Sequence, residues 1–63
     1  MSMTPEQERW AEASAILRIH QDRARVFVAE RIGALAIAGD IAGIKRWKEI
    51  AAKLQQLIEA PRA

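Results

Sequence analysis

The chain has 63 residues, enough for one domain. It contains no cysteine, which excludes disulfides and thiolate metal sites, and its single histidine, His20, excludes an imidazole-rich metal site. Hydrophobic residues make up 51% and charged residues 29%, a composition typical of a globular protein. The formal net charge of +2 is too small to indicate a nucleic-acid partner by itself, and a domain this short is marginally stable unless it packs well or pairs with a second chain.

Neither a membrane span nor an export signal is indicated. The chain has no run of about 18 uncharged apolar residues, and residues 1–10 lack the apolar core that a secretory signal needs. Together with the absence of cysteine, these observations predict a cytoplasmic protein with no membrane partner.

The first helix is predicted over residues 5–20. Its start is marked by Thr4, Pro5 and Gln7, which suit the N-cap, the first helical position and the last position of a capping box. Apolar side chains and the histidine then recur at helical spacing: Trp10, Ala13, Leu17 and His20.

The junction after this helix contains neither glycine nor proline, although Asp22 is a suitable N-cap for a new helix. The apolar stripe keeps its phase across the junction, so a single helix over residues 5–38 is an alternative. Such a helix would be about 50 Å long against about 27 Å for the last helix, and half of its stripe would lack a partner. We therefore predict a bend between His20 and Asp22 and a second helix over residues 22–38.

The second helix is apolar almost all round, because residues 26–38 carry charge only at Glu30 and Arg31, and such a helix is buried on more than one side. One face would serve the intramolecular core: Ala24, Val28, Ile32 and Leu35. The opposite face, which we name the outer face, is the candidate interaction surface: Val26, Ala29, Gly33 and Ile37. Its small residues would let a second helix approach closely, which predicts a twofold homodimer. In the alternative, a flat monomer, the third helix covers this face.

Gly39 and Asp40, in the segment LAIAGDIAGIKRW, are predicted to form a tight hinge before the third helix. Gly39 suits the left-handed residue just past a helix end, and Asp40 suits the N-cap of the next helix. The other interpretation, a phosphate-binding turn between Gly39 and Gly43, lacks the Lys-Ser/Thr pair of a P-loop and places a carboxylate where an anion would sit.

The third helix is predicted over residues 40–59, with Pro61 ending the pattern. Its apolar side includes Trp47, which we expect to anchor the core together with Trp10. Two charge pairs with four-residue spacing are predicted on its exposed side: Lys45–Glu49 and Glu49–Lys53.

Catalytic chemistry is not indicated. His20 near Asp22 could suggest a general base, but no nucleophile or pocket accompanies the pair, and the helix dipole explains a histidine at a helix C-terminus. We therefore predict that the protein is not an enzyme, with no catalytic residues, no cofactor, no metal ion and no small-molecule substrate.

A basic side of the third helix leaves one alternative function, weak nucleic-acid binding. The cations concerned spread over more than half of the helix circumference: Lys45, Arg46, Lys48 and Lys53. A helix that reads DNA would instead concentrate cations and polar side chains on one stripe. We therefore favour protein interaction over this alternative.

Several segments form a pattern that extends over nearly the whole chain: Arg9–Ala13, Ile16–His20, Phe27–Ala36, Ala38–Asp40 and Trp47. In this pattern the chain resembles a family of short bacterial helical proteins known as a domain of unknown function. A glycine often stands in that family where this chain has Gln21, and a proline where it has Arg25, and both would favour a break between the first two helices. The resemblance implies three helices and no activity, cofactor or partner.

These observations predict one all-α domain over residues 1–63, either a three-helix bundle or a helical hairpin with a bent first arm. We expect a small non-catalytic interaction or structural module that forms a homodimer or binds an unidentified protein.

Overall fold

The computed structural model describes residues 2–60, which fold entirely into helices and short connections. The elements are α1 (Pro5–His20), a short 3₁₀ turn η1 (Gln21–Arg23), α2 (Ala24–Ala38) and α3 (Ile41–Glu59). The all-helical prediction is confirmed for this part of the chain. The second helix begins at Ala24 instead of residue 22, because the 3₁₀ turn takes the intervening residues, and the predicted helix end at Pro61 lies outside the described residues.

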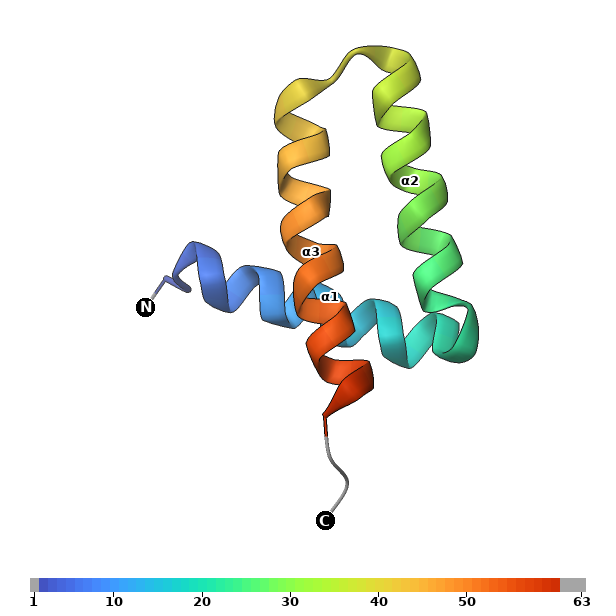
Figure 1. The fold of residues 1–63 in the computed structure, drawn as a ribbon. Helices are drawn as coiled ribbons and strands as arrows, with labels where there is room; N and C mark the ends of the chain where they lie inside the picture. The colour runs from blue at the N-terminus through green and yellow to red at the C-terminus, as the bar shows by residue number, and fades with distance from the viewer. Residues whose placement is uncertain (1, 61–63) are drawn as a thin grey trace.

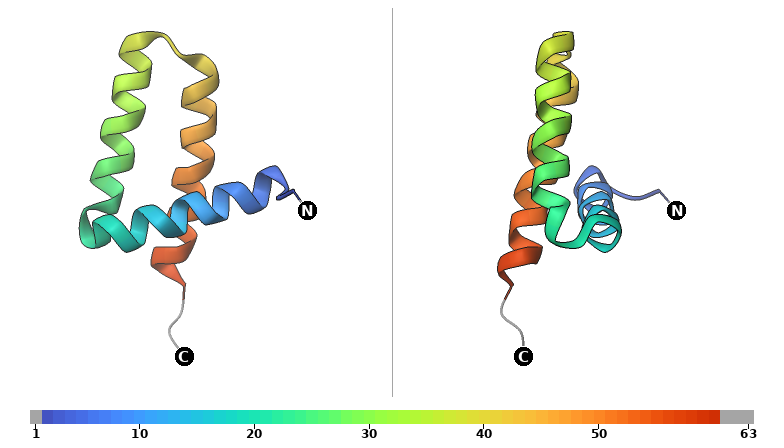
Figure 2. Two further views of the ribbon diagram at one scale, coloured as in Figure 1. Left: turned by 180° about the vertical axis from the view of Figure 1, so that it is seen from behind. Right: turned by 90° about the vertical axis from the view of Figure 1, so that its right-hand side faces the viewer.

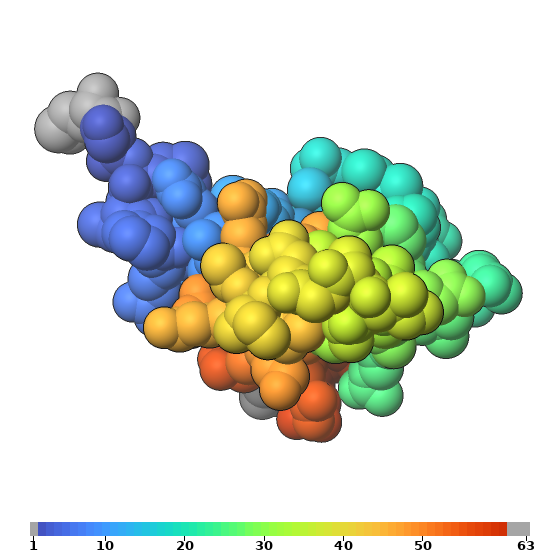
Figure 3. Space-filling model, turned by 90° about the horizontal axis from the view of Figure 1, so that it is seen from above, coloured from blue at the N-terminus to red at the C-terminus, as the bar shows by residue number. Residues whose placement is uncertain are grey.

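Helices α2 and α3 run antiparallel to each other as a hairpin, and α1 crosses one face of it near the end opposite the connecting turn (Figures 1 and 2). The side view in Figure 2 shows α1 end-on, against one side of the hairpin only. Figure 3, a space-filling view from the turn end of the hairpin, also shows α1 on one side of the hairpin only. This arrangement fits the alternative of a helical hairpin with a bent first arm.

The start of α1 is capped by the side chains of Thr4 and Gln7. The Thr4 hydroxyl accepts a hydrogen bond from the Gln7 amide at 3.1 Å, and the Thr4 amide donates to the Gln7 side-chain oxygen at 2.8 Å. This is the capping box predicted from the sequence, and it satisfies two amides that a helix start leaves without partners.

The turn between α2 and α3 depends on one left-handed residue and one cap. Gly39 has a φ of 72°, and its amide donates to the Ala36 carbonyl at 3.1 Å. The Asp40 carboxylate accepts from the Gly43 amide at 2.8 Å. A Cβ on Gly43 would stand 2.7 Å from an Asp40 carboxylate oxygen and 3.0 Å from the Leu35 side chain, so a larger residue there would displace the Asp40 cap and the tip of Leu35.

The core is small. Six of residues 2–60 are buried, and they come from all three α-helices: Ala13, Ile16, Ala24, Val28, Ile50 and Leu54. Among the described residues no buried side-chain nitrogen or oxygen lacks a hydrogen-bond partner. A core with two alanines among six members supplies little apolar burial, so marginal stability is expected. Within residues 2–60, every helix is too short or too polar to cross a bilayer.

The junction between α1 and α2 is strained at Gln21, whose φ of 51° and ψ of −121° lie in a region that glycine adopts readily and other residues avoid. Holding a non-glycine residue in such a conformation costs of the order of 1–3 kcal/mol. The prediction that Asp22 caps the second helix is wrong. The N-cap position of α2 is Arg23, and no side chain forms a cap hydrogen bond there.

Substituting Gln21→Gly is therefore expected to stabilise the folded chain. Relief of the strain exceeds the added flexibility of glycine in the unfolded chain, leaving a net gain of about 1 kcal/mol. For a domain of this size that gain corresponds to a rise of about 4–8 °C in the midpoint of a thermal melt followed by circular dichroism. Gln21→Ala, which retains a Cβ, is the control and should give no such rise. An unchanged midpoint for Gln21→Gly would show that the junction is not strained in solution.

Candidate interaction surface

The two sides of α2 differ sharply in exposure. On the side toward the core, Ala24 and Val28 are buried, at 0% and 3% exposure. On the opposite side Ile37 is 91% exposed and Val26 is 47% exposed. The two small residues of the outer face, Ala29 and Gly33, are also exposed. The structure thus leaves all four residues of the outer face open to solvent, and α3 does not cover them.

Gly33 lies at the centre of the outer face, and nothing in the chain occupies the space above it. A Cβ built at Gly33 would meet no atom within 4 Å. Glycine inside a helix is destabilising relative to alanine by about 0.5–1 kcal/mol. Intramolecular packing therefore gives no reason for glycine at this position, in contrast to Gly43.

The outer face continues into a shallow groove between α2 and α3. The groove is largely apolar: Val28, Ala29, Ile32, Ala51 and Leu54 line it, with Arg25 and Gln55 beside them. Ala29 belongs to both the outer face and this groove. A contacting helix could therefore rest on the edge of α2 and on the groove at once.

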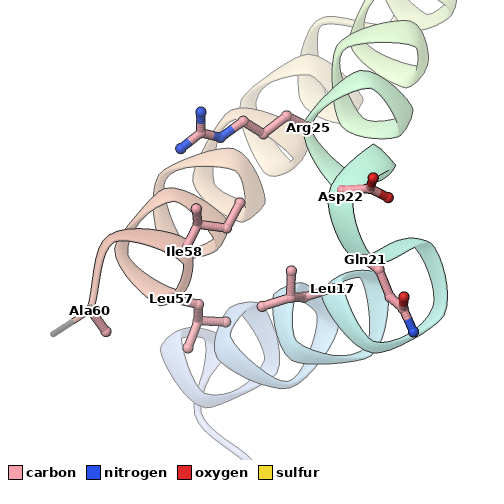
Figure 4. Close-up of a pocket in the computed structure, with 7 residues that line it drawn as sticks. All are labelled: Leu17, Gln21, Asp22, Arg25, Leu57, Ile58 and Ala60. Atoms are coloured by element: carbon pink, nitrogen blue, oxygen red, sulfur yellow. The ribbon is translucent and has the colours of Figure 1, made fainter. Parts of the chain in front are cut away.

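A second hollow lies at the open end of the hairpin, where all three helices meet (Figure 4). Its floor is apolar, formed by Leu17, Leu57 and Ile58, and its polar residues are Gln21, Asp22 and Arg25. No histidine, hydroxyl or carboxylate pair lines it. Across the described residues, no cluster of three or more histidines or carboxylates could hold a metal ion.

In the described part of the chain, the ion pairs between different helices all join α1 to α3. Glu12 on α1 is paired with Arg46, and it also accepts from Arg9 within its own helix. Arg9 in turn lies 3.3 Å from a Glu49 carboxylate oxygen. A further pair links the Lys53 ammonium to Glu6 at 3.2 Å. The predicted pairs Lys45–Glu49 and Glu49–Lys53 are not formed, because Glu49 and Lys53 each find a partner on α1 instead.

Glu12 is the centre of this network. Burial opposes ionisation of its carboxyl group, but the hydrogen bonds from Arg46 and Arg9 outweigh burial and hold the pKa of Glu12 below its ordinary value of 4.5. The same contact raises the pKa of the Arg46 guanidinium. Both shifts mean that ionised Glu12 strengthens the attachment of α1 to the hairpin.

The lowered pKa gives the network a definite dependence on pH. Because the pKa of Glu12 is lower in the folded chain than in the unfolded one, its contribution to stability is complete above the unfolded value and is lost as pH falls through the folded value. Wild type should therefore melt at a higher temperature than Glu12→Gln near neutral pH, and the difference should shrink below pH 4.5. Thermal melts across this range measure it. A constant difference at all pH values would contradict the assignment.

The basic side of α3 is partly neutralised within the molecule. Arg46 and Lys53 are paired with Glu12 and Glu6. Among residues 2–60, Lys45 and Lys48 form no ion pair. Only half of the four cations singled out from the sequence therefore stand without an acidic partner in the described chain.

The tryptophans lie at the margin of the core. Trp10 and Trp47 were both expected to anchor the core, and both are only half-buried. Trp47 packs against the buried cluster and meets Phe27 edge-on, with ring centroids 6.0 Å apart. Trp10 is covered on one face by the Lys53 ammonium, 4.8 Å from the ring centroid. Because α1 covers one side of the hairpin only (Figure 2), neither indole is enclosed, and a cation or an aromatic edge covers part of each one.

His20 ends α1 and its ring stacks on Phe27, with centroids 4.0 Å apart and planes 16° apart. Asp22, whose carboxylate would have to orient the ring in a general-base pair, is exposed in the 3₁₀ turn and makes no hydrogen bond with this histidine. His20 therefore serves the junction as an aromatic contact.

Comparison with known proteins gives one result. The model of DUF6961, a family of unknown function, matches residues 5–62 of the chain. No curated protein and no solved structure is significantly similar to it.

Proposed function

The chain belongs to DUF6961, a family of unknown function, and we propose that it is a small non-catalytic interaction module that self-associates as a homodimer through the outer face of α2. The observation that carries this proposal is the exposure of Ile37 at 91% and of Val26 at 47%, on either side of the open Gly33. Fully burying a large aliphatic side chain contributes roughly 1.5–3 kcal/mol of free energy relative to leaving it in water. Covering this face with a second copy would recover part of that free energy.

The total surface supports the same proposal. The chain exposes 4925 Å², whereas a compact monomer of 7.1 kDa is expected to expose about 4,100 Å². The radius of gyration of 12.2 Å likewise exceeds the value of about 10.6 Å expected for a compact domain of this length. A flat molecule with one uncovered side gains a second layer by pairing.

The absence of cysteine suits a reducing compartment, so we place this module in the cytoplasm.

The alternative function is weak nucleic-acid binding through the two α3 lysines without ion-pair partners in the described chain, Lys45 and Lys48. Two phosphate contacts would give an affinity that falls with rising salt, whereas apolar pairing would not weaken in this way. Titrating the protein with a labelled DNA duplex and an RNA at two salt concentrations separates the two functions.

Gly33→Glu is expected to abolish the dimer. A Cβ at Gly33 would meet no atom of its own chain, and replacing a mid-helix glycine removes a residue that disfavours the helix, so the monomer should keep its fold and the effect should fall on the interface. Size-exclusion chromatography should show the variant at the monomer position with an unchanged helical spectrum. Ala52→Glu places the same charge on an exposed position of α3 and is the matched control, which should remain dimeric. A Gly33→Glu chain that pairs as strongly as wild type would rule out this face.

A further inference from the structure

The attachment of α1 to the rest of the molecule is directed at α3. Each ion pair between different helices of the described chain joins α1 to α3: Arg9–Glu49, Arg46–Glu12 and Lys53–Glu6. The cation–π contact of Lys53 with Trp10 joins the same two helices. These contacts require only that an α1 helix lies across an α3 helix. The α1 helix of a second copy of the chain would form them equally well.

The connection between α1 and α2 is short and strained. Three residues of 3₁₀ turn separate the helices, and none of them is buried. Gln21 holds a positive φ that glycine would adopt without strain. Straightening the junction into a continuous helix would release that strain, because every residue there would then have ordinary helical dihedrals. Short hinge loops under strain favour exchange of an element between copies.

The sequence is compatible with a straight form, in which α1, the junction and α2 make one continuous helix. Counted at 100° per residue, Leu17 and Ala24 stay on one stripe with Val28 and Leu35, and neither glycine nor proline interrupts residues 17–32. Opening breaks the stacking of His20 on Phe27, since residues seven apart on a helix lie about 10 Å apart along its axis. The contacts of α1 with α3 are not lost but are made again with the partner.

We propose that two copies of this chain exchange α1: the junction straightens, and α1 of each copy docks on α3 of the other. The docking surface is the side of α3 that holds α1 in the closed form, the single chain seen in the structure. There, acidic Glu49 and basic Arg46 and Lys53 face complementary charges on α1. Exchange of an identical element is a low-cost route to a twofold dimer, because it creates few new contacts. This inference concerns α1 and goes beyond the proposed pairing through the outer face of α2.

Crosslinking between two differently labelled copies tests the exchange. Glu6 and Glu49 line one hollow between α1 and α3, both are exposed, and the described chain has no free cysteine to interfere. Single variants Glu6→Cys and Glu49→Cys are mixed, unfolded, refolded together at high concentration and treated with a short bis-maleimide. Exchange predicts a covalent product of twice the chain mass on a denaturing gel, absent from either variant alone. The double variant Glu6→Cys/Glu49→Cys, diluted to favour monomers, is the control for closed chains and should crosslink within itself.

The junction supplies a second readout. Gln21→Gly relieves the strain of the closed form, so it should lower the yield of the mixed product several-fold, while Gln21→Ala should not lower it. No mixed product, with intact intrachain crosslinking in the double variant, would overturn the exchange. If the protein is still a dimer in that case, the pairing through α2 stands alone. A mixed product that persists in Gly33→Glu chains would show that the exchange does not depend on the outer face.

Discussion

Replacing Ile50 with alanine is expected to unfold much of the protein at room temperature. Ile50 is 0% exposed and lies in the middle of α3, in the buried cluster that includes Ala13 of α1 and Val28 of α2. Truncating a fully buried isoleucine costs about 2–5 kcal/mol, and a single core of this size rarely supplies more than about 3–5 kcal/mol in total. The free energy of unfolding would therefore fall close to zero.

Urea titration followed by circular dichroism measures this loss, with a lower midpoint and reduced helical signal before denaturant is added. Ile41→Ala is the matched control, since Ile41 is 76% exposed and its truncation should change stability by less than about 0.5 kcal/mol. Equal stabilities for the two variants would show that α3 does not hold the core in the way described.

Replacing Trp47 with alanine is the second large effect, at about 2–3 kcal/mol. A fully buried aromatic costs about 3–5 kcal/mol, and Trp47 should cost less because it is half-buried. The loss includes its packing on the core, its edge-on contact with Phe27 at 6.0 Å and the Arg31 guanidinium 5.6 Å from its ring centroid.

Trp10→Ala provides the comparison and should cost clearly less, because Trp10 is not packed against the buried cluster and its identified partner is the Lys53 ammonium. Each single-tryptophan variant also reports the environment of the remaining indole, and both should show emission of partly shielded rings with intermediate quenching by iodide. Equal destabilisation by the two substitutions would contradict the different roles assigned to these side chains.

Features that depend on neighbouring residues in the chain could be predicted from sequence. The capping box of Thr4 and Gln7 follows from spacing alone, as does the position of Gly39 and Asp40 between two helical segments. The exposure of Val26 and Ile37 was predicted because α2 is apolar on two sides and an intramolecular core covers only one of them. These inferences need no knowledge of how the helices cross.

Features that depend on the crossing of helices could not be predicted. The partners of Glu49 and Lys53 were sought four residues away, whereas the structure supplies Arg9 and Glu6 from α1, more than forty positions away. The tryptophans follow the apolar stripes of their helices, but their burial depends on the oblique packing of α1. The strain at Gln21 left no signal in the sequence of this chain, because the positive φ there depends on how α1 turns back across the hairpin (Figure 1).

Sedimentation equilibrium of the unmodified protein tests most directly whether this chain pairs with itself. A concentration series up to high micromolar should fit a monomer–dimer equilibrium, with a limiting mass twice the chain mass of 7.1 kDa. A single species of 7.1 kDa at every concentration would contradict the account, because the exposed face of α2 would then have no second copy to cover it.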